Sequence, residues 1–112
     1  MANMLDALKI KVERQEHGLM VMSMPVTDEV KQPFGFLHGG ASLALGETAC
    51  SMGAADIIDT EHFIPLGLEM NANHIGSTTE GTIFATATII HEGSTCLLYT
   101  SDAADELLCV DL

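Results

Sequence analysis

Residues 32–54 read QPFGFLHGGASLALGETACSMGA, and this stretch decides the fold. A Pro-Phe-Gly turn and a His-Gly-Gly turn lead into an apolar run, which predicts a helix over about residues 40–57. Small and apolar residues occupy every side of this helix, so we expect a sheet to wrap around it and bury it nearly all round. Glu47 places a charge in the middle of that apolar run, and this charge needs an explanation.

Segments that alternate apolar and polar residues flank the predicted helix on both sides. Residues 8–14 and 18–26 predict two strands joined by a turn, and the three methionines of the second strand are expected to line the core. Residues 65–75 and 81–91 predict two long strands after the helix. Strands, one buried helix and further strands indicate an α+β domain with one antiparallel sheet.

Composition limits the classes of function. The 112 residues suit a single domain, and a formal net charge of −12 with four basic residues argues against nucleic acid and against an anionic membrane surface as partners. The odd number of cysteines, three, argues against a disulfide framework, and their spacing is not that of metal ligands. We find no signal-peptide pattern and no apolar run of the length that a spanning helix needs. A cytoplasmic protein is therefore expected.

The residues at and after the His-Gly-Gly turn are candidates for chemistry. Free N–H groups at a helix start can bind an oxyanion, and the alternative is a plain turn before a helix. Glu47 lies among small or apolar residues, so a desolvated carboxylate suited to base or nucleophile work is expected, with an exposed surface glutamate as the alternative. Gln32 could position water or a carbonyl, or be solvated only. Ser51, one turn after Glu47, could contact substrate or fill space.

A group of possible metal ligands follows the helix. Asp56, Asp59, Glu61 and His62 are close in sequence, but they lack a recognised ligand spacing. A solvated loop is the better interpretation, and we expect no metal site.

Taken together, residues 32–54 closely resemble the helix-start motif of hotdog-fold acyl-CoA thioesterases. Among these, the resemblance is to the phenylacetate-pathway and 1,4-dihydroxy-2-naphthoyl-CoA hydrolase type. Residues 65–94, PLGLEMNANHIGSTTEGTIFATATIIHEGS, resemble the same family, and the resemblance extends over about residues 12–94. It implies an antiparallel sheet wrapped around one central helix, hydrolysis of an aromatic or related acyl-CoA thioester, a place in menaquinone biosynthesis, and self-association as a dimer or tetramer. It implies CoA thioester as substrate and no cofactor.

The resemblance also implies roles for individual residues. Glu47 would be the general base or nucleophile, and the backbone N–H of Gly39 would polarise the thioester carbonyl. Gln32 and His38 would orient the acyl group, and Ser51 would assist near the attacking water. Positions that would contact substrate or CoA are Gly40, His74, Ser77, His91, Gly93 and Ser94.

One position departs from the family pattern. Many members of the family have arginine where this chain has Gly76, and an arginine there can bind CoA phosphate. The loss of that contact predicts modest affinity for CoA.

Two other functions fit the same fold. A non-catalytic acyl-CoA binding or regulatory module would not need a carboxylate at the thioester, so Glu47 argues against it. A hydratase or dehydratase would use a different catalytic pair, and the helix has no equivalent histidine. Function depends on the site and not on the fold, so the site must decide between these alternatives.

The last residues do not follow the family. Residues 96–112, CLLYTSDAADELLCVDL, resemble a translated sequencing adapter. We therefore interpret residues 1–95 as a truncated hotdog thioesterase domain and residues 96–112 as a non-native tail that replaces the native C-terminal strands. Without the four acids of the tail, 12 acidic and 4 basic residues remain, a net charge of −8. Because the tail alternates on either side of a turn, it is nevertheless expected to form a hairpin.

Overall fold

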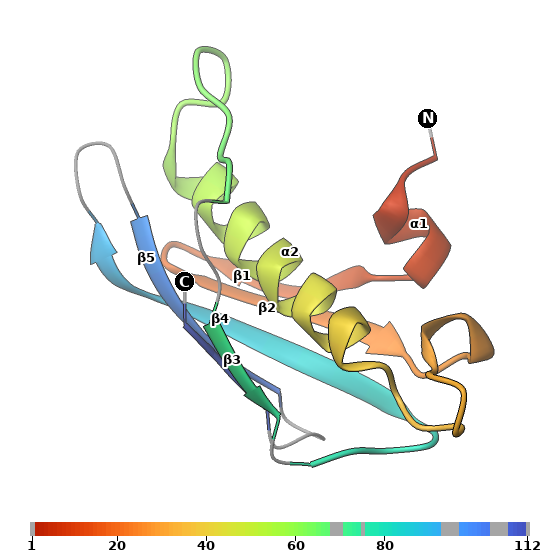
Figure 1. Cartoon of the computed structure of the whole chain (residues 1–112). Coiled ribbons are helices and arrows are strands. Elements are labelled where there is room, and N and C mark those ends of the chain that lie inside the picture. The colour runs from red at the N-terminus through yellow and green to blue at the C-terminus, as the bar shows by residue number, and fades with distance from the viewer. Residues whose placement is uncertain (1, 68–70, 75, 93–96, 104–107, 112) are drawn as a thin grey trace.

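One antiparallel sheet of six strands forms the body of the protein (Figure 1). The computed structural model describes residues 2–67, 71–74, 76–92, 97–103 and 108–111. The strand order is β1-β2-β4-β5-β6-β3. In chain order the strands are β1 (Lys11–Glu16), β2 (Leu19–Pro25), β3 (Asn71–His74), β4 (Thr82–Glu92), β5 (Leu97–Ala103) and β6 (Leu108–Asp111).

A single long helix, α2 (Gly39–Ile57), lies across one face of this sheet (Figure 1). The predicted helix and the α+β hotdog architecture are therefore confirmed. The expectation of burial nearly all round is wrong for the single chain, because the sheet covers only one face of the helix. The buried residues of α2 are Ser42, Leu45, Gly46, Ala49, Cys50, Gly53 and Ala54.

The core lies between α2 and the centre of the sheet. Every second residue of β2 and β4 points toward the helix, as the alternation of the sequence predicted. Met20, Met22 and Met24 are at most 1% exposed, which confirms that the methionines line the core. The turn between β1 and β2 needs Gly18, because its φ is +75° and an added Cβ would lie 2.7 Å from Ile89 Cγ2.

The N-terminal segment corrects the predicted first strand. A short helix, α1 (Met4–Leu8), precedes β1, so the strand predicted over residues 8–14 starts only at Lys11. Asn3 caps α1 by accepting from the N–H groups of Leu5 and Asp6, while the Asp6 carboxylate accepts from the Asn3 N–H. This reciprocal cap provides acceptors for backbone N–H groups at the helix start and favours a helix over a strand.

The strand predicted over residues 65–75 is also shorter than expected. Its described part is β3 (Asn71–His74), and residues 65–67 are not in a strand. The C-terminal segment agrees with the prediction, since the expected hairpin is present as β5 paired antiparallel with β6. Whether residues 96–112 are native sequence stays a prediction.

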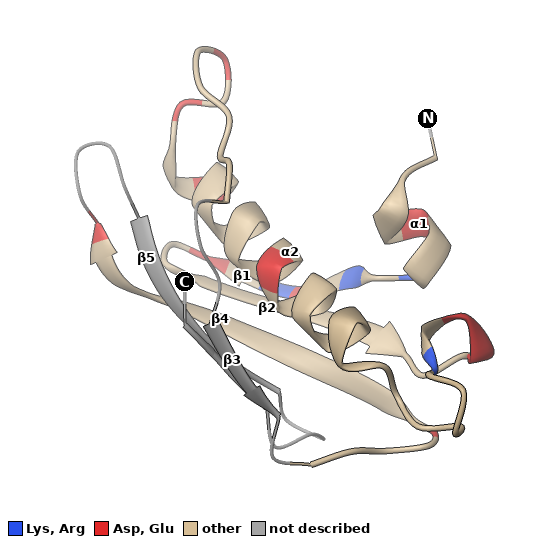
Figure 2. Cartoon of the chain, in the orientation of Figure 1, with Lys and Arg blue, Asp and Glu red and all other residues tan. Residues whose placement is uncertain are grey.

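Acidic residues are spread over the described surface, and lysine and arginine are few (Figure 2). The basic residues are on or near β1 and in the segment before α2 (Figure 2). Among the described residues, no helix is both long and apolar enough to cross a membrane.

Candidate active site at the start of helix α2

Backbone hydrogen bonds fix the segment that leads into α2. The His38 N–H donates to the Val30 carbonyl over 2.8 Å, and the Leu37 N–H donates to the Thr78 carbonyl over 2.8 Å. The turn that precedes Leu37 is closed by the Gly35 N–H, which donates to the Gln32 carbonyl over 3.0 Å. The start of α2 is therefore held between the loop before β4 and the turn at residues 32–36.

His38 is the N-cap of α2 and explains why the helix begins at Gly39. Its Nδ1 accepts from the Gly40 N–H over 2.8 Å. An added Cβ on Gly40 would lie only 2.9 Å from that nitrogen, so glycine gives the ring its space. Because Nδ1 accepts a hydrogen bond, a neutral His38 carries its proton on Nε2 and presents a donor there.

The Gly39 N–H points out of the first turn of the helix, where backbone donors are not used within the helix. Among the residues that the structure describes, it has no hydrogen-bond acceptor. A free N–H at the start of a 19-residue helix combines a donor with the positive end of the helix dipole. Such a group can stabilise a developing oxyanion.

Gln32 is half-buried beside this helix start. Its side-chain carbonyl accepts from the Phe34 N–H over 2.5 Å, so the amide is held within its own turn. The amide nitrogen then faces away from that bond and is available as a donor. Gln32 is thus brought to the same end of the molecule as His38 and Gly39.

Glu47 lies two turns further along α2, and it is exposed in the single chain. The predicted burial of this carboxylate is therefore wrong for one copy of the chain, because α2 presents Glu47 at the edge of the face that the sheet leaves uncovered. Ser51, one turn later, is half-buried on the same side. The neighbour of the carboxylate is Gly67, which was predicted to be part of a strand and not of the site.

Cys50 lies beneath Glu47 on the buried side of the helix, with 2% of its surface exposed. Burial raises the pKa of the Cys50 thiol, and the negative charge of Glu47 raises it further, from the usual 9.0 to about 12. The thiolate of Cys50 is therefore disfavoured at neutral pH, which argues against a role as nucleophile.

Of the positions predicted to contact CoA, Ser77 and His91 lie toward opposite ends of β4. Ser77 is exposed in the loop before β4, and His91 is exposed near the end of β4. His91 is the ninth residue after Thr82 along β4, which corresponds to about 30 Å of extended strand. The side chain of His74, and Gly93 and Ser94 altogether, lie outside the described residues.

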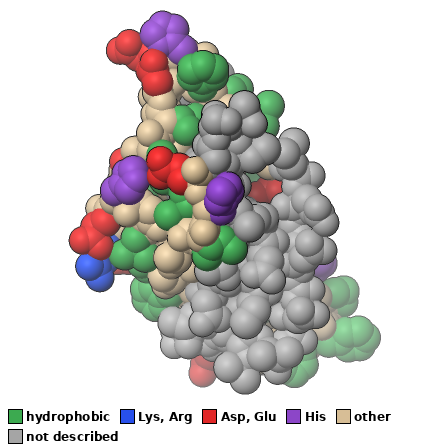
Figure 3. Space-filling view, turned by 90° about the vertical axis from the view of Figure 1, so that its left-hand side faces the viewer, with side chains coloured by type: hydrophobic (Ala, Val, Ile, Leu, Met, Phe, Trp, Pro, Cys, Tyr) green, Lys and Arg blue, Asp and Glu red, His purple; other side chains and the backbone are tan. Residues whose placement is uncertain are grey.

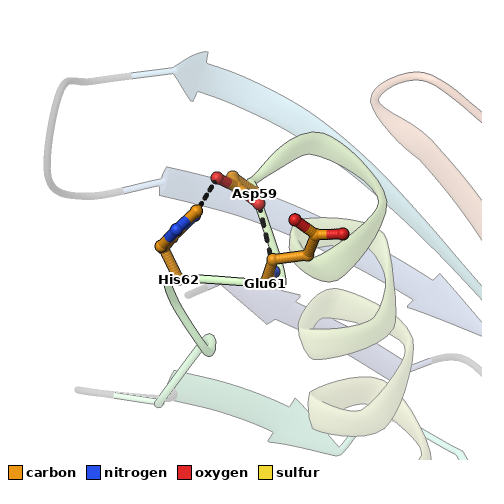
Figure 4. A group of neighbouring side chains, drawn as sticks. All are labelled: Asp59, Glu61 and His62. Carbon is orange, nitrogen blue, oxygen red and sulfur yellow. Dashed lines mark hydrogen bonds and ion pairs between the residues drawn. The ribbon is translucent and has the colours of Figure 1, made fainter.

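The acidic loop after α2 contains a compact group of three side chains (Figure 4). The potential ligand atoms of Asp59, Glu61 and His62 lie within 4.8 Å of one another, and all three residues are exposed. Acidic and histidine side chains gather at this end of the molecule (Figure 3). Asp59 accepts from the Glu61 N–H and lies 2.6 Å from His62 Nδ1, so local hydrogen bonds account for the cluster.

Asp56, the fourth predicted member, is not part of this group. It accepts from the Gln15 amide over 2.6 Å, which links the end of α2 to β1. The expected absence of a metal site stays a prediction.

An antiparallel sheet packed on one long helix is the architecture of the hotdog-fold thioesterases. A family model described as the thioesterase superfamily matches residues 34–106, and the chain belongs to this superfamily. The resemblance predicted from the sequence is thus confirmed. The matched range also extends into the C-terminal segment that resembles an adapter.

Individual relatives agree with this assignment. The chain is 40% identical over 108 residues to the 1,4-dihydroxy-2-naphthoyl-CoA hydrolase of Listeria monocytogenes, covering 94% of this chain and 87% of the relative. It superimposes with a TM-score of 0.95 on the hypothetical protein SAV0944 of Staphylococcus aureus, solved as a Glu47Ala mutant, at 53% identity over 97% of this chain and 93% of that chain. A Q32A mutant of the thioesterase enzyme SAV0944 gives a TM-score of 0.92 at 53% identity, covering 96% of this chain and 92% of that chain.

Proposed function

We propose that this chain hydrolyses the thioester bond of an aromatic acyl-CoA, with Glu47 as the reacting carboxylate and the Gly39 N–H as the oxyanion donor. The observation that supports this most is the geometry of α2. It offers a backbone N–H without an acceptor among the described residues at its start, and an exposed carboxylate two turns along. Membership of the thioesterase superfamily supports the reaction type.

The proposed residues supply what thioester hydrolysis needs. Attack on the carbonyl carbon places negative charge on the carbonyl oxygen, which the Gly39 N–H would stabilise by roughly 3–4 kcal/mol, the usual value of one such donor. Glu47 would take the proton of the attacking water, and would return it to the CoA sulfur as the carbon–sulfur bond breaks. The products are the free acid and the CoA thiol, so atoms and charge balance without a cofactor.

A second route is open to the same carboxylate. Glu47 could attack the carbonyl itself, expel the thiolate and form a mixed anhydride that water then hydrolyses. Single turnover in ¹⁸O-labelled water separates the two routes. Direct attack by water puts the label in the product acid. An anhydride that water opens at its Glu47 carbonyl puts the label in Glu47 instead and releases an unlabelled acid in the first turnover, so label in Glu47 identifies the anhydride route.

The length of the helix indicates that one site uses two copies of the chain. Gly39 and Glu47 are eight residues apart, which is about 12 Å along a helix. The N–H must lie about 3 Å from the carbonyl oxygen and the carboxylate beside the water that attacks the same carbonyl carbon, and a separation of about 12 Å along one helix is long for that arrangement. Two copies with their α2 helices antiparallel would place the Gly39 of one beside the Glu47 of the other.

The exposed face of α2 is suited to such pairing. It carries small residues, including Gly40, Ala44 and Ser51, so two helices could approach closely. The large exposed apolar side chains of the loop after α2 add surface that a partner copy would cover. These side chains are Phe63, Ile64 and Leu66, which are between 65% and 77% exposed. Pairing would also bury Glu47, as the sequence analysis expected.

An aromatic acyl group is the substrate that the relatives favour, since the Listeria relative is named for the 1,4-dihydroxy-2-naphthoyl thioester. The apolar loop before Gly67 offers a surface of matching chemistry beside Glu47. We accordingly extend the proposal to menaquinone biosynthesis and to CoA as the carrier, with self-association as a dimer or tetramer.

Thiol release from a panel of aryl- and alkyl-CoA esters tests the proposal. The wild-type chain should release thiol fastest from aryl esters, and Glu47→Ala should lose at least about a hundredfold in kcat. Thr60→Ala, an exposed change in the loop after α2, is the matched control and should keep wild-type turnover. A folded Glu47→Ala variant with wild-type kcat would contradict the proposed role.

A further inference from the structure

The loop between α2 and β3 returns along the helix and reaches Glu47. The helix ends at Ile57, yet an added Cβ on Gly67 would lie 3.2 Å from Glu47 Oε1 and 3.7 Å from its Cδ. Glu47 is ten residues before Ile57, about 15 Å back along the helix. Figure 1 shows the chain leaving the end of α2 as a loop and then turning back toward the sheet. The backbone at Gly67 is therefore a direct neighbour of the carboxylate.

The backbone conformation does not require glycine at this position. Among the described glycines, Gly18, Gly35 and Gly81 have positive φ, and Gly67 does not. An alanine could adopt the same backbone, so the constraint on Gly67 is space. A contact of 3.2 Å between carbon and oxygen is tighter than ordinary packing, so a side chain at this position would displace the carboxylate by a few tenths of an ångström.

Nothing else in the described part of the chain holds the Glu47 carboxylate. It takes part in no hydrogen bond or ion pair with the described residues. Because its side chain is exposed, it can move without disturbing the core. A side chain at position 67 is therefore expected to shift the carboxylate and leave the fold intact.

We propose that Gly67 is a positioning residue for the reaction: the absence of a side chain lets the backbone of the returning loop pack against the Glu47 carboxylate and set where it meets the thioester. This proposal rests on the proposed function of Glu47. Catalytic groups must be placed accurately, since a misplacement of about 1 Å can cost a hundredfold in rate. On the same scale, a shift of about 0.3 Å should cost roughly fourfold.

The test compares Gly67→Ala in two backgrounds, using thiol release from an aryl-CoA ester. With Glu47 present, Gly67→Ala should lower kcat roughly fourfold, leave KM within about twofold and leave the midpoint of thermal unfolding unchanged. In the Glu47→Asp background the carboxylate is one methylene shorter and further from the added Cβ. There, Gly67→Ala should change kcat less than about twofold, because the two positions are coupled.

The outcomes separate this inference from the function on which it rests. A Gly67→Ala variant with wild-type kcat would overturn the positioning role, and so would an equal loss of kcat in both backgrounds. Loss of thiol release in Glu47→Ala, measured alongside, would leave the proposed function standing in either case. Wild-type turnover in Glu47→Ala would overturn both proposals.

Discussion

Replacing Gly39 by proline should delete the oxyanion donor and keep the helix. Proline has no N–H and is favoured at the first position of a helix. The Gly39 N–H has no acceptor among the described residues, so its loss costs no described hydrogen bond. His38 has φ −70° and ψ 129°, an extended conformation that a residue before proline can adopt. We therefore expect Gly39→Pro to fold with an unchanged midpoint of thermal unfolding.

The kcat of Gly39→Pro, in contrast, should fall strongly. Loss of one oxyanion donor typically lowers kcat by a hundred- to a thousandfold, or about 3–4 kcal/mol of transition-state stabilisation. Gly39→Ala is the matched control, because it adds the same Cβ and keeps the N–H. The assay is thiol release from an aryl-CoA ester under saturating substrate. If Gly39→Pro keeps a kcat within about threefold of Gly39→Ala, the Gly39 N–H is not the donor.

Three further predictions follow from the core, the buried thiol and the C-terminal segment. Met22→Ala should lower the free energy of unfolding by about 2–5 kcal/mol in urea titrations, whereas Met4→Ala, at a position that is 56% exposed, should change it by less than about 1 kcal/mol. The pKa of Cys50 is raised in the folded state to about 12, so the native thiol stays protonated at a pH where the unfolded one ionises. The free energy of unfolding should therefore fall as the pH rises from about 9 to about 12. In the same titrations, the free energy of unfolding of Cys50→Ala should fall less steeply. Replacing residues 96–112 by the final strands of a close relative should raise the midpoint of thermal unfolding by at least about 5 °C in calorimetry, and an unchanged midpoint would contradict the interpretation of this segment as a non-native tail.

The elements that were predicted correctly carry strong periodic signals. The alternation in β2 and β4 depends on residues two apart that face one buried helix, and the helix start depends on local turn chemistry at His38. The helix α1 was missed because it has only five residues, and its capping pair, Asn3 and Asp6, was not weighed against the strand pattern that follows.

The exposure of Glu47 in one chain could not be predicted, because a helix with small residues on every side gives no signal for which side packs against the sheet. The sheet covers the side of Leu45 and Ala49, and it leaves Glu47 exposed. Nor could spacing in sequence show that Gly67 returns to Glu47, since that contact depends on the path of a loop without regular structure.

The central claim is that each site combines Gly39 of one copy with Glu47 of another. Co-expression of differently tagged Gly39→Pro and Glu47→Ala chains, followed by purification through both tags, gives a mixed pair of two inactive chains. In a two-site pair of this kind, one site collects both changes and the other is intact, so about half of the wild-type kcat per pair should return. A mixed pair that stays as inactive as its parents would contradict the claim and place both residues in one chain's own site.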